Sequence, residues 1–165
     1  LPGIVSVLDE YGFLDQIEAV AGTSIGAVFA FLWTVGFTGR EIVDWVSCID
    51  FKILSDNMNL SNLLTKGSVG DLKFMKDIMS EFLEMKKLEP TISFSEVQKK
   101  FNKKLYINAV CYETGEHIIF NPDDYPDFPV MEAVIGSCSL PGVFNRYVYK
   151  DRSYLDGGVI QAYLI

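Results

Sequence analysis

Histidine is nearly absent from the sequence, which contains His117 and no other. A mechanism that requires two histidines is therefore excluded, and one that requires a single histidine must use His117. The three cysteines, Cys48, Cys111 and Cys138, are widely spaced and form no C-x-x-C pair, which disfavours a disulfide framework or a zinc site. The sequence therefore favours a reducing compartment and predicts no metal and no cofactor.

Basic residues are few: 14 Lys and Arg against 22 Asp and Glu give a formal net charge of −8. We expect no nucleic-acid partner, because proteins that bind nucleic acid present clustered positive charge. Attraction to anionic lipid is weak for the same reason. The chain starts at Leu1 without a basic segment or signal peptide. We therefore expect an internal fragment with a cytoplasmic or peripheral membrane location.

Size and composition predict a single domain over residues 1–165. Of the 165 residues, 49% are apolar and 22% charged, which is typical of a folded domain. Apolar spacing and turn residues predict helices, strands and two hairpins in an order that favours an α/β domain with three layers. The expected helices are Pro2–Tyr11, Ile25–Val35, Thr38–Ile49, Asp71–Lys87, Ser93–Lys104 and Val130–Ser139, and the expected strands are Ile17–Ala21, Leu105–Tyr112, Ile118–Phe120, Tyr147–Tyr149 and Ser153–Leu155.

A G-x-S-x-G motif, Gly22-Thr23-Ser24-Ile25-Gly26, lies between an expected strand and the helix that follows it. A chain that turns from strand to helix at one residue adopts a tight backbone, which exposes the Ser24 hydroxyl. We expect Gly22 and Gly26 to be required, because they remove Cβ atoms that would clash there. The backbone N–H of Ile25 and the start of the helix favour an oxyanion in the same space. The motif predicts a serine nucleophile.

The same two glycines form a G-x-x-x-G pattern within Ala19–Phe37, a stretch without charged residues. A membrane helix with a dimerisation face is therefore an alternative interpretation. Glycines and hydroxyl residues interrupt this stretch, however, and the β-rich second half of the chain needs it as a packing partner. The composition favours the strand–turn–helix interpretation.

Asp156-Gly157-Gly158, after the last expected strand, is the second candidate. Taken alone it is equally a hairpin turn, since Asp-Gly is a common turn dipeptide. A serine nucleophile needs a base, however, and His117 lies in an ordinary hairpin, where we expect a structural or surface histidine. A carboxylate is a weak base, with a reference pKa of about 3.9, and needs a dry site and close placement to serve. We expect Asp156 to be that base.

The serine motif with a distant Asp-Gly-Gly resembles the patatin-like phospholipase family, which uses a Ser–Asp dyad without histidine. The resemblance covers nearly the whole chain: Leu1–Gly12 is similar to the family's first helix, and Gly136–Phe144 resembles the segment before its aspartate strand. It implies a three-layer α/β/α domain with a central, mostly parallel sheet. It also implies a nucleophile, a general base and supporting glycines, which are Ser24, Asp156, Gly22, Gly26, Gly157 and Gly158.

Two features of the family are missing. Its first strand and its glycine-rich loop, which supplies most of the oxyanion hole, would lie upstream of Leu1, and Gly3 does not replace them. The family usually shows an Asn-Pro pair after the Asp-Gly-Gly, whereas this chain reads Ile160-Gln161-Ala162-Tyr163-Leu164. We therefore expect a fragment truncated at its N-terminus, in which the Ile25 N–H is the remaining oxyanion donor.

The resemblance implies a serine acyl hydrolase that cleaves fatty-acyl esters of phospholipids or related lipids and contacts the membrane surface. One alternative is a lipid-binding or scaffold domain of the same fold without the chemistry, because the oxyanion hole is incomplete. Another is an acyltransferase that uses the same residues.

Two further segments carry predictions of their own. The polar segment Ser55–Gly70 and the helix Asp71–Lys87 predict a mobile flap, on which Met75 and neighbouring leucines offer apolar surface to an acyl chain. The acidic loop Asp123–Asp127 has carboxylates for a calcium site, but no EF-hand spacing supports one.

Overall fold

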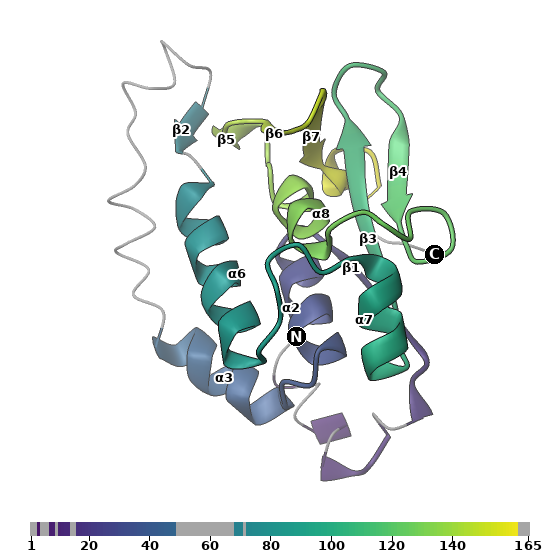
Figure 1. Ribbon diagram of the computed structural model, residues 1–165. Helices are drawn as coiled ribbons and strands as arrows, with labels where there is room; N and C mark the ends of the chain where they lie inside the picture. Colours follow the sequence, from purple (N-terminus) through teal and green to yellow (C-terminus); the bar gives the residue numbers. More distant parts are fainter. Residues whose placement is uncertain are drawn as a thin grey trace.

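The computed structural model describes residues 3, 7–8, 10–13, 16–48, 68–70 and 72–161, with the backbone alone at 48 and 68–70. Half of the expected first helix Pro2–Tyr11 and most of the expected flap segment Ser55–Gly70 lie outside these residues. The described elements form an α/β domain (Figure 1). They are β1 (Ala19–Thr23), α2 (Ile25–Thr34), α3 (Gly39–Cys48), β2 (Ser68–Gly70), α6 (Lys73–Met85), α7 (Phe94–Phe101), β3 (Lys104–Cys111), β4 (His117–Phe120), α8 (Val130–Ser137), β5 (Gly142–Phe144), β6 (Tyr147–Tyr149), β7 (Arg152–Asp156) and the short 3-10 helix η2 (Gly157–Val159).

The main sheet is built around β3. β1 pairs with β3 in parallel, β4 and β7 pair with β3 antiparallel, and β6 pairs antiparallel with β7. Among the described strands the sheet is therefore mixed, not mostly parallel as expected. The reason is local, because β3–β4 and β6–β7 are hairpins, and short turns join antiparallel strands. A separate small sheet pairs β2 with β5 in parallel.

β1 and β7 share one edge of β3. β1 pairs with the first part of β3 and β7 with its last three residues, whereas β4 pairs with the middle and overlaps both. A strand has two edges, so β4 occupies one, and β1 and β7 follow each other along the other. Since β1 runs parallel to β3 and β7 antiparallel, their C-terminal ends meet there. Thr23 pairs with Asn108, and Asp156 pairs with the next residue, Ala109.

The helices enclose one apolar core. α2, α7 and α8 contact the sheet, α3 contacts α2, and α6 contacts α8 (Figure 1). α2 is almost wholly apolar because it is buried between β1 and α8, where Phe31 and Leu32 have no exposed surface. The α/β class with three layers is thus as the sequence predicts.

The uncharged stretch Ala19–Phe37 is divided between a strand and a helix. β1 has 5 residues and α2 has 10, so the interpretation of this stretch as a membrane helix is wrong. In the part of the chain that the structure describes, no helix is long and apolar enough to cross a bilayer.

The sequence patterns Thr38–Glu41 and Ser93–Glu96 each predict a capping box, and both boxes are present. The Thr38 N–H donates to Glu41 Oε2 at 2.7 Å, and the Glu41 N–H donates to Thr38 Oγ1 at 3.2 Å. The pair Ser93 and Glu96 makes the same two hydrogen bonds at 2.8 and 3.3 Å. These pairs satisfy N–H groups at the starts of α3 and α7 that have no partner within the helix. Asp71, the first residue of the expected helix Asp71–Lys87, lies outside the described residues.

α6, which was expected to belong to a flap, is anchored in the core. Met79 is fully buried and Met75 is only 9% exposed. One turn further, the Phe82 ring packs edge-on against Phe37 and Trp45, with ring centroids 5.3 and 4.7 Å apart. The expectation that Met75 offers exposed apolar surface is therefore wrong, because the apolar face of α6 points to the core.

Acid should weaken one link between the two hairpins. Glu113, in the β3–β4 turn, accepts hydrogen bonds from the Ser153 N–H at 3.0 and 3.2 Å. Hydrogen bonds from the Ser153 side chain and backbone lower the pKa of Glu113 from an ordinary value near 4.5 to about 2. A lowered pKa means that the stabilisation is present above the ordinary value and is lost as pH falls through about 2.

We predict that Glu113→Gln lowers the free energy of unfolding at neutral pH, and that the difference from wild type narrows as pH falls from about 4.5 to about 2. Urea denaturation at several pH values measures this. A difference that stays constant over this range would show that the carboxylate does not contribute through its charge.

Candidate functional site

Ser24 lies at the junction between β1 and α2, where the motif predicts it. Its backbone has φ 55° and ψ −134°, a conformation that side-chain-bearing residues rarely adopt and that costs on the order of 1–3 kcal/mol. Ser24 is the N-cap of α2, a position where a serine hydroxyl usually accepts a hydrogen bond from the helix. Here its side chain makes no capping bond. The hydroxyl is therefore not used to stabilise the helix.

The two motif glycines contribute differently. A Cβ on Gly22 would overlap the carbonyl oxygen of Gly26 and lie 2.6 Å from the Ala27 Cα, and these backbone atoms cannot move aside. A Cβ on Gly26 would meet nothing within 4 Å. The expectation that both glycines remove a clash is right for Gly22 and wrong for Gly26, because the close approach is made by the Gly26 backbone.

The C-terminal end of α8 holds the chain on both sides of the site. The Ser137 hydroxyl accepts a hydrogen bond from the Ser24 N–H at 2.9 Å and donates one to the Asn108 carbonyl at 2.6 Å. Two residues later, the Ser139 carbonyl accepts a hydrogen bond from the Asp156 N–H at 3.0 Å. The sequence analysis did not identify Ser137. The feature that could have indicated it is a hydroxyl residue in an otherwise apolar helix.

Asp156 ends β7 and is 2% exposed. Its Oδ1 accepts a hydrogen bond from the Gly158 N–H at 2.8 Å. Neither Gly157 nor Gly158 has free space for a side chain. A Cβ on Gly157 would overlap the Asn108 side chain, and a Cβ on Gly158 would lie 3.1 Å from Asp156 Oδ1. Among the described residues, no hydrogen bond joins the Asp156 carboxylate to the Ser24 hydroxyl. Such bonds are often long before substrate binds.

His117 lies on β4, and its Nε2 contacts Asn108 Oδ1 at 2.5 Å. In the described part of the chain it makes no hydrogen bond to Ser24. This contact fits the structural role expected of the single histidine.

Exposed apolar side chains flank the junction in three segments. One follows Ser24, two belong to the turn after Asp156, and one lies in the loop after α8. They are Ile25, Val159, Ile160 and Leu140, with exposed fractions of 50%, 53%, 53% and 43%. Exposed apolar side chains in these segments suit contact with an apolar ligand.

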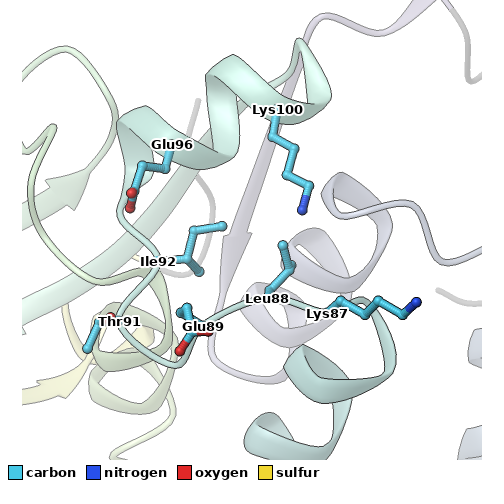
Figure 2. Close-up of a pocket in the computed structure, with 7 residues that line it drawn as sticks. All are labelled: Lys87, Leu88, Glu89, Thr91, Ile92, Glu96 and Lys100. Carbon is cyan, nitrogen blue, oxygen red and sulfur yellow. The ribbon is translucent and has the colours of Figure 1, made fainter.

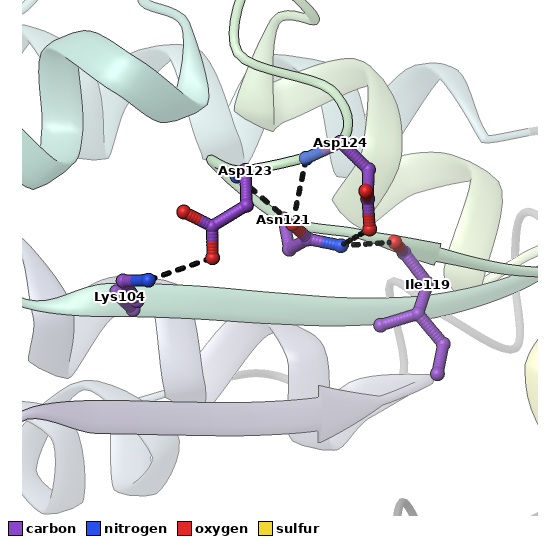
Figure 3. Close-up of polar contacts among 5 residues, drawn as sticks. All are labelled: Lys104, Ile119, Asn121, Asp123 and Asp124. Atoms are coloured by element: carbon purple, nitrogen blue, oxygen red, sulfur yellow. Dashed lines mark hydrogen bonds and ion pairs between the residues drawn. The ribbon is translucent and has the colours of Figure 1, made fainter.

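The acidic loop after β4 is built around Asn121 (Figure 3). Its Oδ1 accepts hydrogen bonds from the N–H groups of Asp123 and Asp124, and its Nδ2 donates to the Asp124 carboxylate. Asp123 forms an ion pair with Lys104 at 2.6 Å. Two of the loop's carboxylates, Asp123 and Asp124, are therefore already bound to side chains of the protein. Across the described residues, no group of three or more metal-ligating side chains could hold a metal ion.

A pocket of about 300 Å³ lies between α7 and the chain that follows α6 (Figure 2). None of the predicted site residues lines it, and Glu96 is already bonded to Ser93. It is therefore a surface hollow separate from the β1–α2 junction. Its lining residues are Lys87, Leu88, Glu89, Thr91, Ile92, Glu96 and Lys100.

Known proteins resemble this chain over most of its length. The sequence model of a family described as "Patatin-like phospholipase" matches residues 2–165. "Probable lipid hydrolase 463L" of Invertebrate iridescent virus 6 is 27% identical over 155 residues, which covers 88% of this chain and 51% of that protein. "Uncharacterized protein YqhO" of Bacillus subtilis is 30% identical over 182 residues, which covers 100% and 60%. The chain therefore spans less than two thirds of these relatives.

Two solved structures share the fold. VipD from Legionella pneumophila superposes with a TM-score of 0.71 at 14% identity, over 99% of this chain and 44% of VipD. ExoU, solved with SpcU from the type III secretion system of Pseudomonas aeruginosa, superposes with a TM-score of 0.57 at 22% identity, over 86% of this chain and 34% of its own. At these identities the likeness establishes the fold alone.

Because the motif glycines have unequal roles, we predict that replacing each by alanine changes the free energy of unfolding differently. Gly22→Ala should lower the free energy of unfolding by at least about 1–3 kcal/mol, because its Cβ meets fixed backbone. Gly26→Ala should leave stability unchanged or raise it by about 0.5–1 kcal/mol, since alanine favours a helix. Thermal or urea unfolding of both variants measures the contrast. Equal effects would contradict the assigned backbone path.

Proposed function

The chain belongs to the patatin-like phospholipase family, and we therefore propose that it carries a serine acyl hydrolase site for fatty-acyl esters of phospholipids or related lipids. Ser24 is the nucleophile and Asp156 the general base. The conformation of Ser24 is the observation that supports this most. Its backbone is strained, and its side-chain hydroxyl does not cap α2. Strain of this kind persists where the surrounding structure enforces it and concentrates at active sites.

In the proposed first step, the Ser24 hydroxyl oxygen forms a bond to the ester carbonyl carbon while its proton passes to the Asp156 carboxylate. The carbonyl oxygen becomes an oxyanion, which accepts a hydrogen bond from the Ile25 N–H at the start of α2. When the intermediate collapses, the bond to the alcohol breaks and the alcohol takes the proton from Asp156. The acyl group remains on Ser24.

In the second step, water attacks the acyl carbon and gives a proton to Asp156. The bond between Ser24 and the acyl group then breaks, the fatty acid leaves, and Ser24 regains its proton. An aspartate serves here through placement more than basicity. Its side chain is shielded from water, and its backbone is fixed by β3 on one side and by the Ser139 carbonyl on the other.

The surface around the junction supports a lipid substrate. The four exposed apolar residues that flank it offer contact to an acyl chain, and the formal net charge of −8 gives little attraction to anionic headgroups. The proposed contact with a membrane surface is therefore peripheral and apolar.

Turnover in four variants tests the proposal. Ser24→Ala and Asp156→Asn in the whole protein should each lower the rate of fatty-acid release from phospholipid vesicles by at least about 10³-fold, since each removes a group that forms or breaks bonds. Ser93→Ala is the matched serine control, because Ser93 is an N-cap whose hydroxyl does bind its helix. It should lose about 1 kcal/mol of stability and keep its activity.

Asp151→Asn, in the exposed turn between β6 and β7, is the matched aspartate control and should retain full activity. Wild-type protein that binds vesicles without releasing fatty acid would contradict the proposal in favour of a lipid-binding domain. Transfer of the acyl group to an added alcohol in preference to water would favour an acyltransferase with the same residues.

A further inference from the structure

A buried asparagine, Asn108, lies at the point of β3 where β1 and β7 meet. It is 0% exposed; it pairs with Thr23, and its neighbour Ala109 pairs with Asp156. A buried amide costs free energy unless its hydrogen bonds are made, and an apolar residue fills a strand more easily. The position therefore calls for an amide for a reason other than packing.

The Asn108 amide uses both of its donor hydrogens and its oxygen. Nδ2 donates to Thr23 Oγ1 at 3.2 Å and to the backbone carbonyl of Gln161 at 2.6 Å. Oδ1 contacts His117 Nε2 at 2.5 Å. Thr23 directly precedes Ser24, and Gln161 follows the turn that begins at Asp156. One amide therefore ties together the two chain segments that carry the proposed nucleophile and base.

The turn after Asp156 lies directly against this amide. A Cβ on Gly157 would lie 2.5 Å from Asn108 Oδ1 and 2.6 Å from its Nδ2. The backbone carbonyl of Asn108 also accepts the hydrogen bond of Ser137, whose hydroxyl in turn binds the Ser24 N–H. A rotation or loss of the side-chain amide would break its hydrogen bonds to Thr23 and to Gln161, one beside Ser24 and the other after Asp156.

The partners of Asn108 determine the orientation of its amide and the tautomer of neutral His117. A backbone carbonyl only accepts hydrogen bonds, so the Gln161 oxygen must face Nδ2. Oδ1 then faces His117 and also only accepts, so Nε2 must carry a proton and donate it. The neutral form of His117 is therefore the Nε2–H tautomer.

We infer that Asn108 is a positioning residue for Ser24 and Asp156, and that His117 orients its amide through the Nε2–H···Oδ1 hydrogen bond. The effect on turnover rests on the proposed function. The hydrogen bond between His117 and Asn108 does not rest on the proposed function, so the proposed function and this hydrogen bond can be disproved independently. The inference gives the single histidine of the chain a role in the site without contact with substrate.

Two substitutions of His117 test the inference, one that removes the hydrogen-bond donor and one that replaces it. His117→Leu removes the donor and should lower kcat for fatty-acid release by about tenfold or more with little change in KM, because small displacements of reacting groups slow the reaction strongly. His117→Gln supplies an amide N–H to Oδ1 and should keep kcat within about threefold of wild type. Wild-type kcat in both variants, or an equal loss in both, would overturn the inference.

Asn108→Asp provides a second test, because it places an oxygen against the Gln161 carbonyl. It should lower kcat by at least about tenfold. Asn121→Asp is the matched control: Asn121 is also buried, makes several hydrogen bonds, and follows β4 on the other edge of β3 (Figure 3). It should keep kcat within about twofold even where it lowers stability. An equal loss in both variants would mean that general destabilisation explains the effect.

Nuclear magnetic resonance of ¹⁵N-labelled histidine tests the hydrogen bond without any activity. His117 is the single histidine of the 165-residue chain, and the spectrum of His117→Gln, which lacks its signals, assigns them. At a pH where the imidazole is neutral, we expect the proton on Nε2 in the wild type and in Ser24→Ala. A proton on Nδ1 would overturn the inference. If Ser24→Ala retained wild-type turnover, the proposed function would fail, and this spectrum would still decide the hydrogen bond.

Discussion

β1 and β7 meet on one edge of β3, and this pairing sets the positions of Ser24 and Asp156. Because one strand runs parallel to β3 and the other antiparallel, their C-terminal ends converge beside Asn108 and Ala109. The chain leaves β1 as the strained turn at Ser24 and leaves β7 as the turn at Asp156. Backbone pairing alone therefore brings Thr23 and Asp156 side by side, although they lie far apart in the sequence.

The strain at Ser24 is held by several independent contacts. Gly22 lets the backbone of α2 approach β1 closely, the Ser137 hydroxyl binds the Ser24 N–H, and the buried face of α2 anchors the helix in the core. A backbone cost on the order of 1–3 kcal/mol is comparable to what the burial of one large apolar side chain contributes, about 1.5–3 kcal/mol, and α2 buries several. The turn is therefore stable although its conformation is unfavourable locally.

Local patterns predicted most of the elements. The G-x-S-x-G motif located the turn at Ser24, and the Thr38 and Ser93 capping boxes located two helix starts, because each depends on residues close in sequence. Contacts between distant segments were not predictable in this way. Ser137 and Asn108 are ordinary residues until the fold brings Ser24, Thr23 and Gln161 to them. For the same reason the motif did not distinguish Gly22 from Gly26, since only the path of the backbone decides which Cβ would clash.

The proposed mechanism requires Ser24 to be an activated serine, and covalent labelling tests this directly. A fluorophosphonate probe forms a stable bond to an activated serine oxygen, and peptide mapping by mass spectrometry locates that bond. We predict a single adduct on the peptide that contains Ser24, formed much more slowly in Asp156→Asn. An adduct on another serine, or equal rates of labelling in wild type and Asp156→Asn, would contradict the account.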